Sequence, residues 1–307
     1  MFQQHLGEFA ALFTAIFWTV TSLSFEAAGK RIGSLTVNLI RLYIAYGIYT
    51  VYLYFVRGMA FPSDATREAW IWLSLSGVIG FAVGDLLLFQ AFVVVGARIS
   101  MLFMALVPPI TALIGWMILG ETLSLQSVFG MMLTISGVAM VVLKPDENHP
   151  DITKRKKLRL NYPLVGILLA FGGAVGQAVG LVLSKFGMKD YDAFAASQIR
   201  VLAGLISFTA IFFFLRRWHR VWNGLKNPKG MLFTSLGSVF GPFLGVSFSL
   251  LAVQHTSTGV AATIMSIVPI LLIPPAIILF REKVTIREVI GSFIAVSGVA
   301  LLFLEQG

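Results

Sequence analysis

Cysteine is absent from this sequence of 307 residues, and charged residues supply only 12% of it. Without thiols the chain has no disulfide bond, no thiolate nucleophile and no cysteine-ligated metal. Its four histidines are scattered along the sequence, so we expect neither a metal site nor a cofactor. A soluble domain normally carries about a quarter charged residues. The shortage of charge therefore argues against a water-soluble protein.

Long hydrophobic runs take the place of the missing charge. Hydrophobic residues make up 57% of the sequence, and the mean hydropathy is +0.87. The runs are about twenty residues long, which is the length that a helix needs to cross a bilayer. The sequence therefore predicts an all-α polytopic membrane protein, since a helix satisfies its own backbone hydrogen bonds in lipid. Ten transmembrane helices are expected, over about 6–25, 36–56, 70–92, 97–118, 126–143, 163–184, 193–216, 230–253, 258–280 and 286–304.

The net charge of +9 comes from basic residues in the connections, such as KRKKLR at 154–159 and RRWHR at 216–220. We interpret them as topology signals and contacts to anionic lipid headgroups, and not as a nucleic-acid surface. The expected partners are the lipid bilayer and a small-molecule substrate. One long polar, basic linker over 144–162 separates two halves, 1–143 and 163–307, each with five predicted helices.

The two halves are copies of each other. VPPITALIGWMILGE at 107–121 matches VPILLIPPAIILFRE at 268–282, and at the same offset SGVA at 136–139 recurs at 297–300. After a shift of two residues, IR at 40–41 recurs at 199–200. Five helices are an odd number, so the second copy must enter the membrane from the opposite side. Two inverted repeats are a recurrent architecture of secondary transporters, which bind their substrate between the repeats near the membrane midplane.

The P…GE…G…SGV pattern of both halves resembles the EamA-type members of the drug/metabolite transporter superfamily. The resemblance covers nearly the whole chain. It implies a ten-helix, basket-shaped carrier in the cell membrane that moves small metabolites, often amino acids, and usually outward. We expect a monomer or a weak dimer. The resemblance does not fix the substrate.

The orientation in the membrane is open at this stage. Seventeen of the 23 Lys and Arg residues fall on the face that holds the first, third, fifth, seventh and ninth connections. The face with both termini holds Arg57, Arg67, Lys185 and Lys189. The positive-inside rule then predicts termini outside the cytoplasm, whereas the resemblance implies cytoplasmic termini.

Asp85 is an acid inside a predicted span, in the stretch GDLLLFQAF. It lies roughly 10 Å deep, at 1.5 Å per residue from the end of that span. A carboxyl group there is either protonated or paired with a cation. Arg41 lies at a similar depth and enters from the same face, so we expect the two to pair. The pair either locks two helices together or lines a substrate pathway, in which Asp85 takes a proton or an ammonium group and Arg41 a carboxylate.

Arg200 is the repeat partner of Arg41, but the second half has Val246 and Ser247 where the first has Asp85. Arg200 therefore lacks a matching acid, with Glu8 and Glu121 as candidate partners. The cavity should be electrostatically asymmetric.

Weaker pathway candidates complete the set. Trp18 and Gln177 occupy equivalent places in the two repeats, and Trp18 either faces substrate or packs against lipid. Asn38 lies one turn before Arg41 and suits its orientation, and Ser247 is the pathway candidate at the position that corresponds to Asp85. Prolines in corresponding helices free backbone carbonyls and predict kinks that gate the binding region. These prolines are Pro108, Pro109, Pro269, Pro274 and Pro275.

Three other functions compete with efflux. VGD at 83–85 is similar to part of the signature of intramembrane aspartyl proteases, but Ala82 stands where that motif needs glycine, so no enzyme is expected. A non-transporting scaffold or sensor would not need an inverted duplication. Uptake or facilitative exchange is the stronger rival, because coupling sets the direction, with protons as a candidate coupling ion.

Overall fold

The computed structural model describes residues 5–119, 123–145, 158–256, 261 and 264–303, and nearly all of them are helical. The first half contains α1 (Leu6–Ile32), α2 (Ser34–Arg57), α3 (Arg67–Gly77), the π-helix η2 (Val78–Gly84), α4 (Asp85–Met104), α5 (Val107–Leu119) and α6 (Leu125–Val142). The second half contains α7 (Leu164–Met188), α8 (Ala193–Leu215), α9 (Trp218–Leu225), α10 (Pro228–Ser238), the π-helix η3 (Val239–Gly245), α11 (Val246–His255), α13 (Val268–Leu271), α14 (Ile273–Phe280) and α15 (Ile286–Phe303).

Seven helical segments in the described part of the chain are long and apolar enough to cross a membrane. They are Leu6–Ile32, Ser34–Arg57, Arg67–Met104, Leu125–Val142, Leu164–Met188, Ala193–Leu215 and Pro228–Ala252. Two shorter apolar segments, Val107–Met117 and Val268–Phe280, accompany them. The prediction of a helical membrane protein is confirmed.

The segment Arg67–Met104 is 38 residues long, far more than the roughly 20 that a bilayer needs. Its helix breaks at Gly96, where the backbone has φ 84° and ψ 161°. A side chain would be strained at this positive φ, and glycine is not. The break separates the residues before Gly96 from Ala97 and Arg98, which continue toward α5.

The elements of the two halves correspond at a constant offset. Helix α3 and η2 match α10 and η3, while α6 matches α15, each shifted by the 161 residues that separate the sequence repeats. The two π-helices therefore occupy equivalent positions in the two repeats, and each repeat contains one. The chain has a two-repeat architecture.

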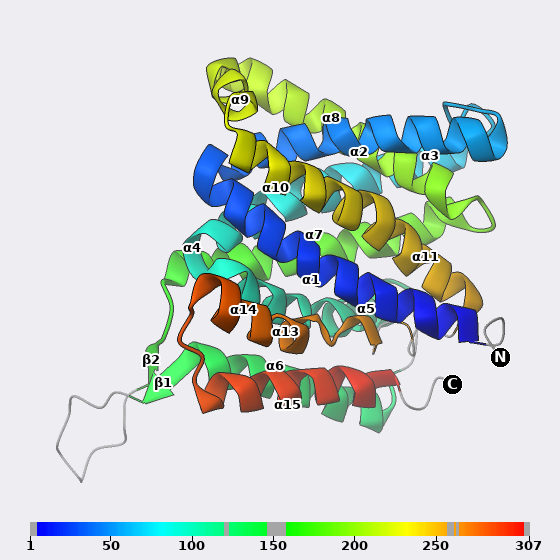
Figure 1. Cartoon of the computed structure of the whole chain (residues 1–307). Coiled ribbons are helices and arrows are strands. Elements are labelled where there is room, and N and C mark those ends of the chain that lie inside the picture. The colour runs from blue at the N-terminus through cyan, green and yellow to red at the C-terminus, as the bar shows by residue number, and fades with distance from the viewer. Residues whose placement is uncertain (1–4, 120–122, 146–157, 257–260, 262–263, 304–307) are drawn as a thin grey trace, which may run out of the picture.

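The first helix of each half packs on the other half. Helix α1 lies along α10, η3 and α11, and α7 lies along α3, η2 and α4 (Figure 1). Glycines permit the second contact, because a Cβ on Gly176 would lie only 2.6 Å from the Cα of Gly84. The arginine-bearing helices α2 and α8 also pack against each other. The two halves are thus interleaved, and residues from both meet in the middle.

Two short strands at the ends of the linker are the only strands among the described residues. Strand β1 (Leu143–Pro145) pairs antiparallel with β2 (Leu158–Leu160) at the two ends of the linker. The pairing satisfies backbone groups of a segment that leaves the membrane-spanning helices. Residues 146–157 lie outside the described residues.

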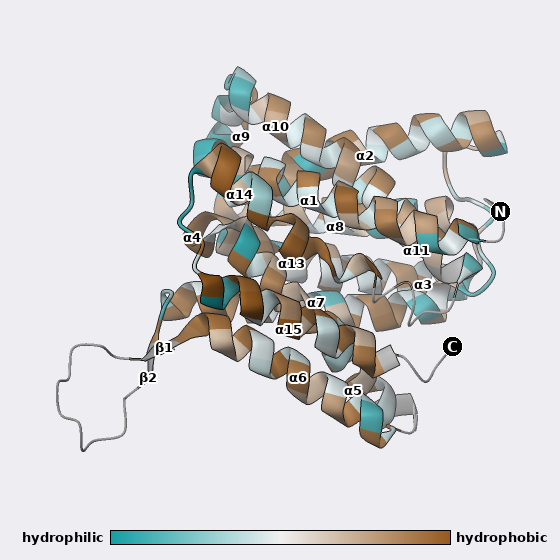
Figure 2. Cartoon of the chain, turned by 60° about the horizontal axis from the view of Figure 1, so that its bottom comes forward, coloured by the Kyte–Doolittle hydropathy of each residue, from teal (hydrophilic) through white to brown (hydrophobic). Residues whose placement is uncertain are grey.

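The outer surface is apolar over the bodies of the helices and polar at their ends (Figure 2). Phe55, Phe214 and Ile278 are 79%, 80% and 73% exposed, which suits contact with lipid chains. Short helix α9 differs from the others, since it buries Val221 and Gly224 while Trp222 is exposed. It follows the basic stretch at 216–217, as expected for a helix at the membrane surface.

Candidate functional site

A cavity of about 260 Å³ lies between the two halves. The first half lines it from α1, α2, η2, α4 and α5, and the second half from α7, α8, η3, α11 and α13. Most of its wall is apolar. The charged residues among its lining are Arg41, Asp85 and Arg200.

Arg41 and Asp85 form an ion pair in this cavity. Nη2 of Arg41 lies 2.5 Å from Oδ2 of Asp85, and the two side chains are only 3% and 6% exposed. The Arg41 guanidinium also lies over the ring of Phe89, with its carbon 4.5 Å from the ring centroid. The contact is the one that equal depth and a shared face predict.

Two amides hold the pair in place. Nε2 of Gln177 donates to Oδ1 of Asp85 at 2.5 Å. Oδ1 of Asn38 accepts a hydrogen bond from Nε of Arg41 at 3.1 Å, and its Nδ2 donates to the backbone carbonyl of Asp85 at 3.2 Å. Each carboxylate oxygen of Asp85 therefore has its own donor. The site combines α2 and α4 of the first half with α7 of the second.

Arg200 lines the same cavity from α8 and is 6% exposed. Its guanidinium carbon lies 5.0 Å from the ring centroid of Phe81. Its Nε has no hydrogen-bond partner in the structure. Glu8 instead lies 3.7 Å from His5, and Glu121 is outside the described residues. Within the described residues, no acid forms an ion pair with Arg200.

The remaining candidates divide between the wall and its support. Trp18 lines the cavity and packs against Gly245, where a Cβ would lie 2.7 Å from the indole. Ser247 is fully buried and lies 3.0 Å from the hydroxyl of Tyr49, which donates to the carbonyl of Pro242 at 2.6 Å. Ser247 is not part of the cavity lining, and through Tyr49 it is connected to the backbone of η3. Sequence reasoning missed Tyr49, because a tyrosine in an apolar run gives no distinctive signal.

The prolines stand at the starts of helical segments. Pro108 and Pro109 lie in the first turn of α5, after a break at 105–106 that separates it from α4. Pro269 begins α13, and Pro274 and Pro275 begin α14. Proline is tolerated in a first turn, where no intrahelical donor is needed. Only Pro108 and Pro269 of this set line the cavity.

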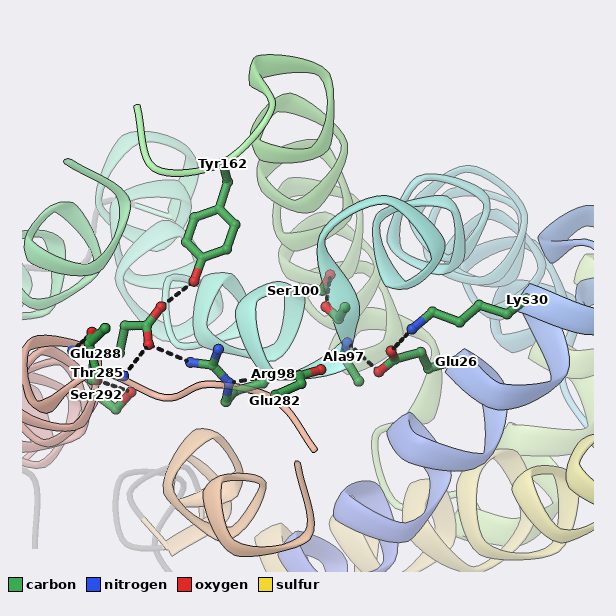
Figure 3. A network of polar contacts seen from close by, with 11 residues as sticks. Glu26, Lys30, Ala97, Arg98, Ser100, Tyr162, Glu282, Thr285, Glu288 and Ser292 are labelled. Carbon is green, nitrogen blue, oxygen red and sulfur yellow. Dashed lines mark hydrogen bonds and ion pairs between the residues drawn. The ribbon is translucent and has the colours of Figure 1, made fainter. Parts of the chain in front are cut away.

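A second polar cluster joins the halves beyond the cavity (Figure 3). Arg98, just after the Gly96 break, lies 3.2 Å from Glu282 and 3.4 Å from Glu288 of the second half. The hydroxyl of Tyr162 donates to Glu288. We name Arg98, Tyr162, Glu282 and Glu288 the inter-half network. Arg98 was not singled out from the sequence, because it counts among the basic residues at a predicted connection.

Neighbouring residues show where the inter-half network lies. Phe25 lines the cavity, and the next residue, Glu26, accepts a hydrogen bond from the backbone N–H of Ala97 at 2.7 Å. Glu26 also pairs with Lys30. The network therefore lies between the cavity and the face that holds most of the basic residues.

A different cluster joins the halves at the opposite end of the helices. Asp64 accepts hydrogen bonds from Arg57 at 2.6 Å and from the Tyr191 hydroxyl at 2.8 Å. Desolvation raises the pKa of Asp64, but Tyr191 and Arg57 outweigh it, and the pKa lies below its ordinary value. Lys189 and Glu68 form a further pair at 3.0 Å. These pairs are more exposed than the inter-half network.

The site offers binding chemistry. The described residues contain no group of three or more His, Asp or Glu side chains that could hold a metal. The cavity instead presents a neutralised ion pair, a second guanidinium and aromatic rings. That arrangement can hold and release a small solute.

Comparison with known proteins supports this interpretation. The EamA-like transporter family matches the sequence twice, over residues 5–143 and 164–304. The chain is 27% identical over 192 residues to solute carrier family 35 member G1 of Mus musculus, a match that covers 62% of this chain and 50% of that protein. It is 24% identical over 206 residues to the uncharacterized transporter YvbV of Bacillus subtilis (strain 168), covering 66% of this chain and 62% of that protein. The chain thus spans about half the length of the first of these curated relatives. A crystal structure of another protein shares the fold, with a TM-score of 0.61 over 98% of both chains at 13% identity.

Proposed function

Since this chain belongs to the EamA-like transporter family, we propose that it is a secondary transporter for small polar metabolites, amino acids or related compounds. One observation carries the proposal. The cavity between the halves is lined by charged groups from both of them, with Arg41 and Asp85 from the first and Arg200 from the second. Buried ionisable groups in a membrane protein are costly, and they mark substrate or ion pathways.

Ten spans in two inverted five-helix repeats, 1–143 and 163–307, are part of this proposal. The break at Gly96 divides the segment Arg67–Met104 into the end of one span and the start of the next. Helix α15 and the two shorter apolar segments supply the remaining crossings. Each half then crosses the membrane five times and the second is inverted relative to the first.

Transport proceeds by alternating access, with the inter-half network as one gate. Arg98 connects the Gly96 break to Glu282 and Glu288, so this end of the cavity opens only when the two ion pairs separate. The glycine break and the proline-started segments α5, α13 and α14 supply the hinges. At the other end, the exposed cluster around Asp64 holds the second gate.

Efflux across the cell membrane is the proposed direction, and uptake or exchange by the same fold is the alternative. The bacterial transporter among the relatives supports a place in the cell membrane. A scaffold or sensor without transport would not need two repeats with matched helix breaks. We propose a monomer or weak dimer with protons as the coupling ion, because Asp85 is an intramembrane acid that could exchange a proton when its pair with Arg41 opens.

Flux measurements on the full chain in proteoliposomes test the proposal. Wild type is expected to move at least one amino acid or related metabolite, and Asp85→Asn is expected to lose the response to a pH gradient. Glu8→Gln, which alters an exposed pair with His5 outside the cavity lining and outside both gates, is the control and should keep that response. The absence of flux for every solute, with and without a pH gradient, would contradict transport. If Asp85→Asn responds to a pH gradient as wild type does, proton coupling through Asp85 is contradicted, whereas transport itself is not.

A further inference from the structure

Arg200 is a buried cation with unused hydrogen-bonding capacity. Its side chain reaches the cavity from α8 and is 6% exposed, and its Nε has no hydrogen-bond partner among the described residues. The Phe81 ring, at 5.0 Å, gives the guanidinium a cation–π contact but accepts no hydrogen bond from its edge. A buried charge without a hydrogen-bonded counterion is costly in a low-dielectric site. The position therefore favours binding of an anion.

The neighbouring acid is not free to serve as that anion. Both oxygens of Asp85 accept bonds at 2.5 Å, one from Arg41 and one from Gln177. Its attraction to Arg200 acts only at longer range. Among the described lining residues there are two cations and one anion, so this part of the lining carries one positive charge that none of its other residues neutralises.

The rest of the wall sets the chemistry of the ligand's body. Aromatic and aliphatic side chains surround the charged groups. They include Trp18, Phe25, Phe81, Leu88, Phe89 and Phe92. The cavity volume of about 260 Å³ lies just below the range of typical small-molecule sites, about 300–1,000 Å³. A compact solute with an apolar or aromatic body fits this space.

We infer that Arg200 is the anchor for the carboxylate of a small organic monoanion with an apolar or aromatic body. The guanidinium presents two parallel N–H donors to a carboxylate, and the bound carboxylate supplies the missing acceptor for Nε. This inference rests on the proposed transport function and narrows its solutes to net anions. A zwitterion would also bring an ammonium group, which would have to compete with Arg41 and Gln177 for the oxygens of Asp85. The order of affinity should be carboxylate, then zwitterion, then amine.

Four ligands of similar shape differ in their charge at neutral pH. They are the anion 3-phenylpropionate, the neutral 3-phenylpropionamide, the zwitterion phenylalanine and the cation phenethylamine. Binding to the purified full chain in lipid nanodiscs is measured by titration calorimetry at neutral pH. We expect 3-phenylpropionate to bind at least about tenfold more tightly than the amide, as one charge-assisted bidentate contact provides. Arg200→Gln should remove that preference, and Arg200→Lys should keep part of it. Arg31→Gln, which changes a cation stacked on Phe233 outside the cavity lining, should keep it fully.

A stability measurement separates anchoring from a structural role. An unneutralised cation destabilises the empty protein, so Arg200→Gln should keep or raise the unfolding temperature while it abolishes carboxylate binding. A lower unfolding temperature, with the preference for carboxylate kept in the folded fraction, would overturn the inference. Equal binding of acid and amide to wild type would also overturn it.

Flux in proteoliposomes separates this inference from the proposed function. Wild type that carries phenylalanine or phenethylamine but does not bind the carboxylate would leave transport standing and refute the anion anchor. Wild type that binds the carboxylate through Arg200 but moves no solute would support the anion anchor and contradict the proposed transport.

Discussion

Arg41 and Asp85 hold opposite charges in a place where water cannot screen them, since both side chains are almost fully buried. Removing one partner of such a pair leaves an uncompensated buried charge, which costs about 3–5 kcal/mol. We therefore expect Asp85→Asn to lower the free energy of unfolding by that amount. The double variant with Arg41→Gln should recover most of the loss, because no charge is then left unpaired.

Thermal unfolding in detergent micelles measures this effect. Asp64→Asn is the matched control, because it breaks an Arg–Asp pair in which Asp64 is 36% exposed. Exposed pairs contribute about 0–1 kcal/mol, so its unfolding temperature should change little. A single variant at Asp85 as stable as the control would show that the buried pair does not stabilise the fold.

Depth and topology were sufficient to predict which charges could meet at the site. Arg41 and Asp85 lie at similar depths on one face, and the structure places them in contact. The repeat made Arg200 the asymmetric charge of the predicted cavity, but arithmetic along the sequence did not show which helix contacts place it beside Arg41 and Asp85. The interleaving of the halves brings it there, and interleaving depends on packing that the hydropathy of a single helix does not encode. Gln177 joins Asp85 for the same reason.

At the scale of elements, the contact of α7 with η2 depends on the absence of side chains. A Cβ on Gly176 would lie 2.6 Å from the Cα of Gly84, and backbone atoms cannot rotate away as a flexible side chain can. Gly176→Ala should separate the two elements and lower the free energy of unfolding by about 1–3 kcal/mol, as overpacking does.

Gly47→Ala is the control for this prediction. A Cβ on Gly47, within α2, would meet no atom within 4 Å. Alanine favours the helix over glycine by about 1 kcal/mol, so this variant should be neutral or slightly stabilising. Unfolding temperatures of both variants in the same detergent provide the comparison. Equal stability of the two would mean that close approach at Gly176 is not required.

The repeat in the sequence predicted which elements of the two halves correspond, but it did not predict the Gly96 break and the π-helical turns within them. Matched glycines and prolines located the equivalent segments of the two repeats. In the structure α6 corresponds to α15, and α3 corresponds to α10. The π-helices η2 and η3 and the break at Gly96 were not predicted. Glycine in an apolar run indicates close packing as readily as a bend, so the pattern alone does not distinguish the two. The short helix α9 and the two strands were likewise absent from the expectation.

For the whole molecule, the inter-half network should decide access to the cavity from its own end. Arg98→Gln removes both ion pairs to the second half, and the closed state loses stability relative to the open one. Since the chain has no cysteine, Ser22→Cys in the cavity lining gives a single labelling site. We expect Arg98→Gln to increase its labelling by a charged, impermeant maleimide about tenfold from the network side, equivalent to about 1.4 kcal/mol.

Labelling from both sides of oriented vesicles provides the comparison for this gate. Arg57→Gln, at the opposite end of the helices, is the matched control and should not increase labelling from the network side. If Arg98→Gln gives the same labelling as its parent from that side, the network does not close the cavity.

The orientation of the molecule can be predicted from the distribution of its basic residues. Helix α1 begins and α15 ends at one end of the bundle (Figure 1), and most Lys and Arg lie at the other, including Arg31, Arg98 and the basic residues around α9. The positive-inside rule holds the basic end in the cytoplasm, because basic loops resist translocation. A reporter active only in the cytoplasm, fused after Gly307, should therefore be inactive, and the same reporter inserted into the linker after Pro150 should be active. The reverse pattern would favour cytoplasmic termini, as the family resemblance implies, and it would place the inter-half network and its gate on the outer face of the membrane.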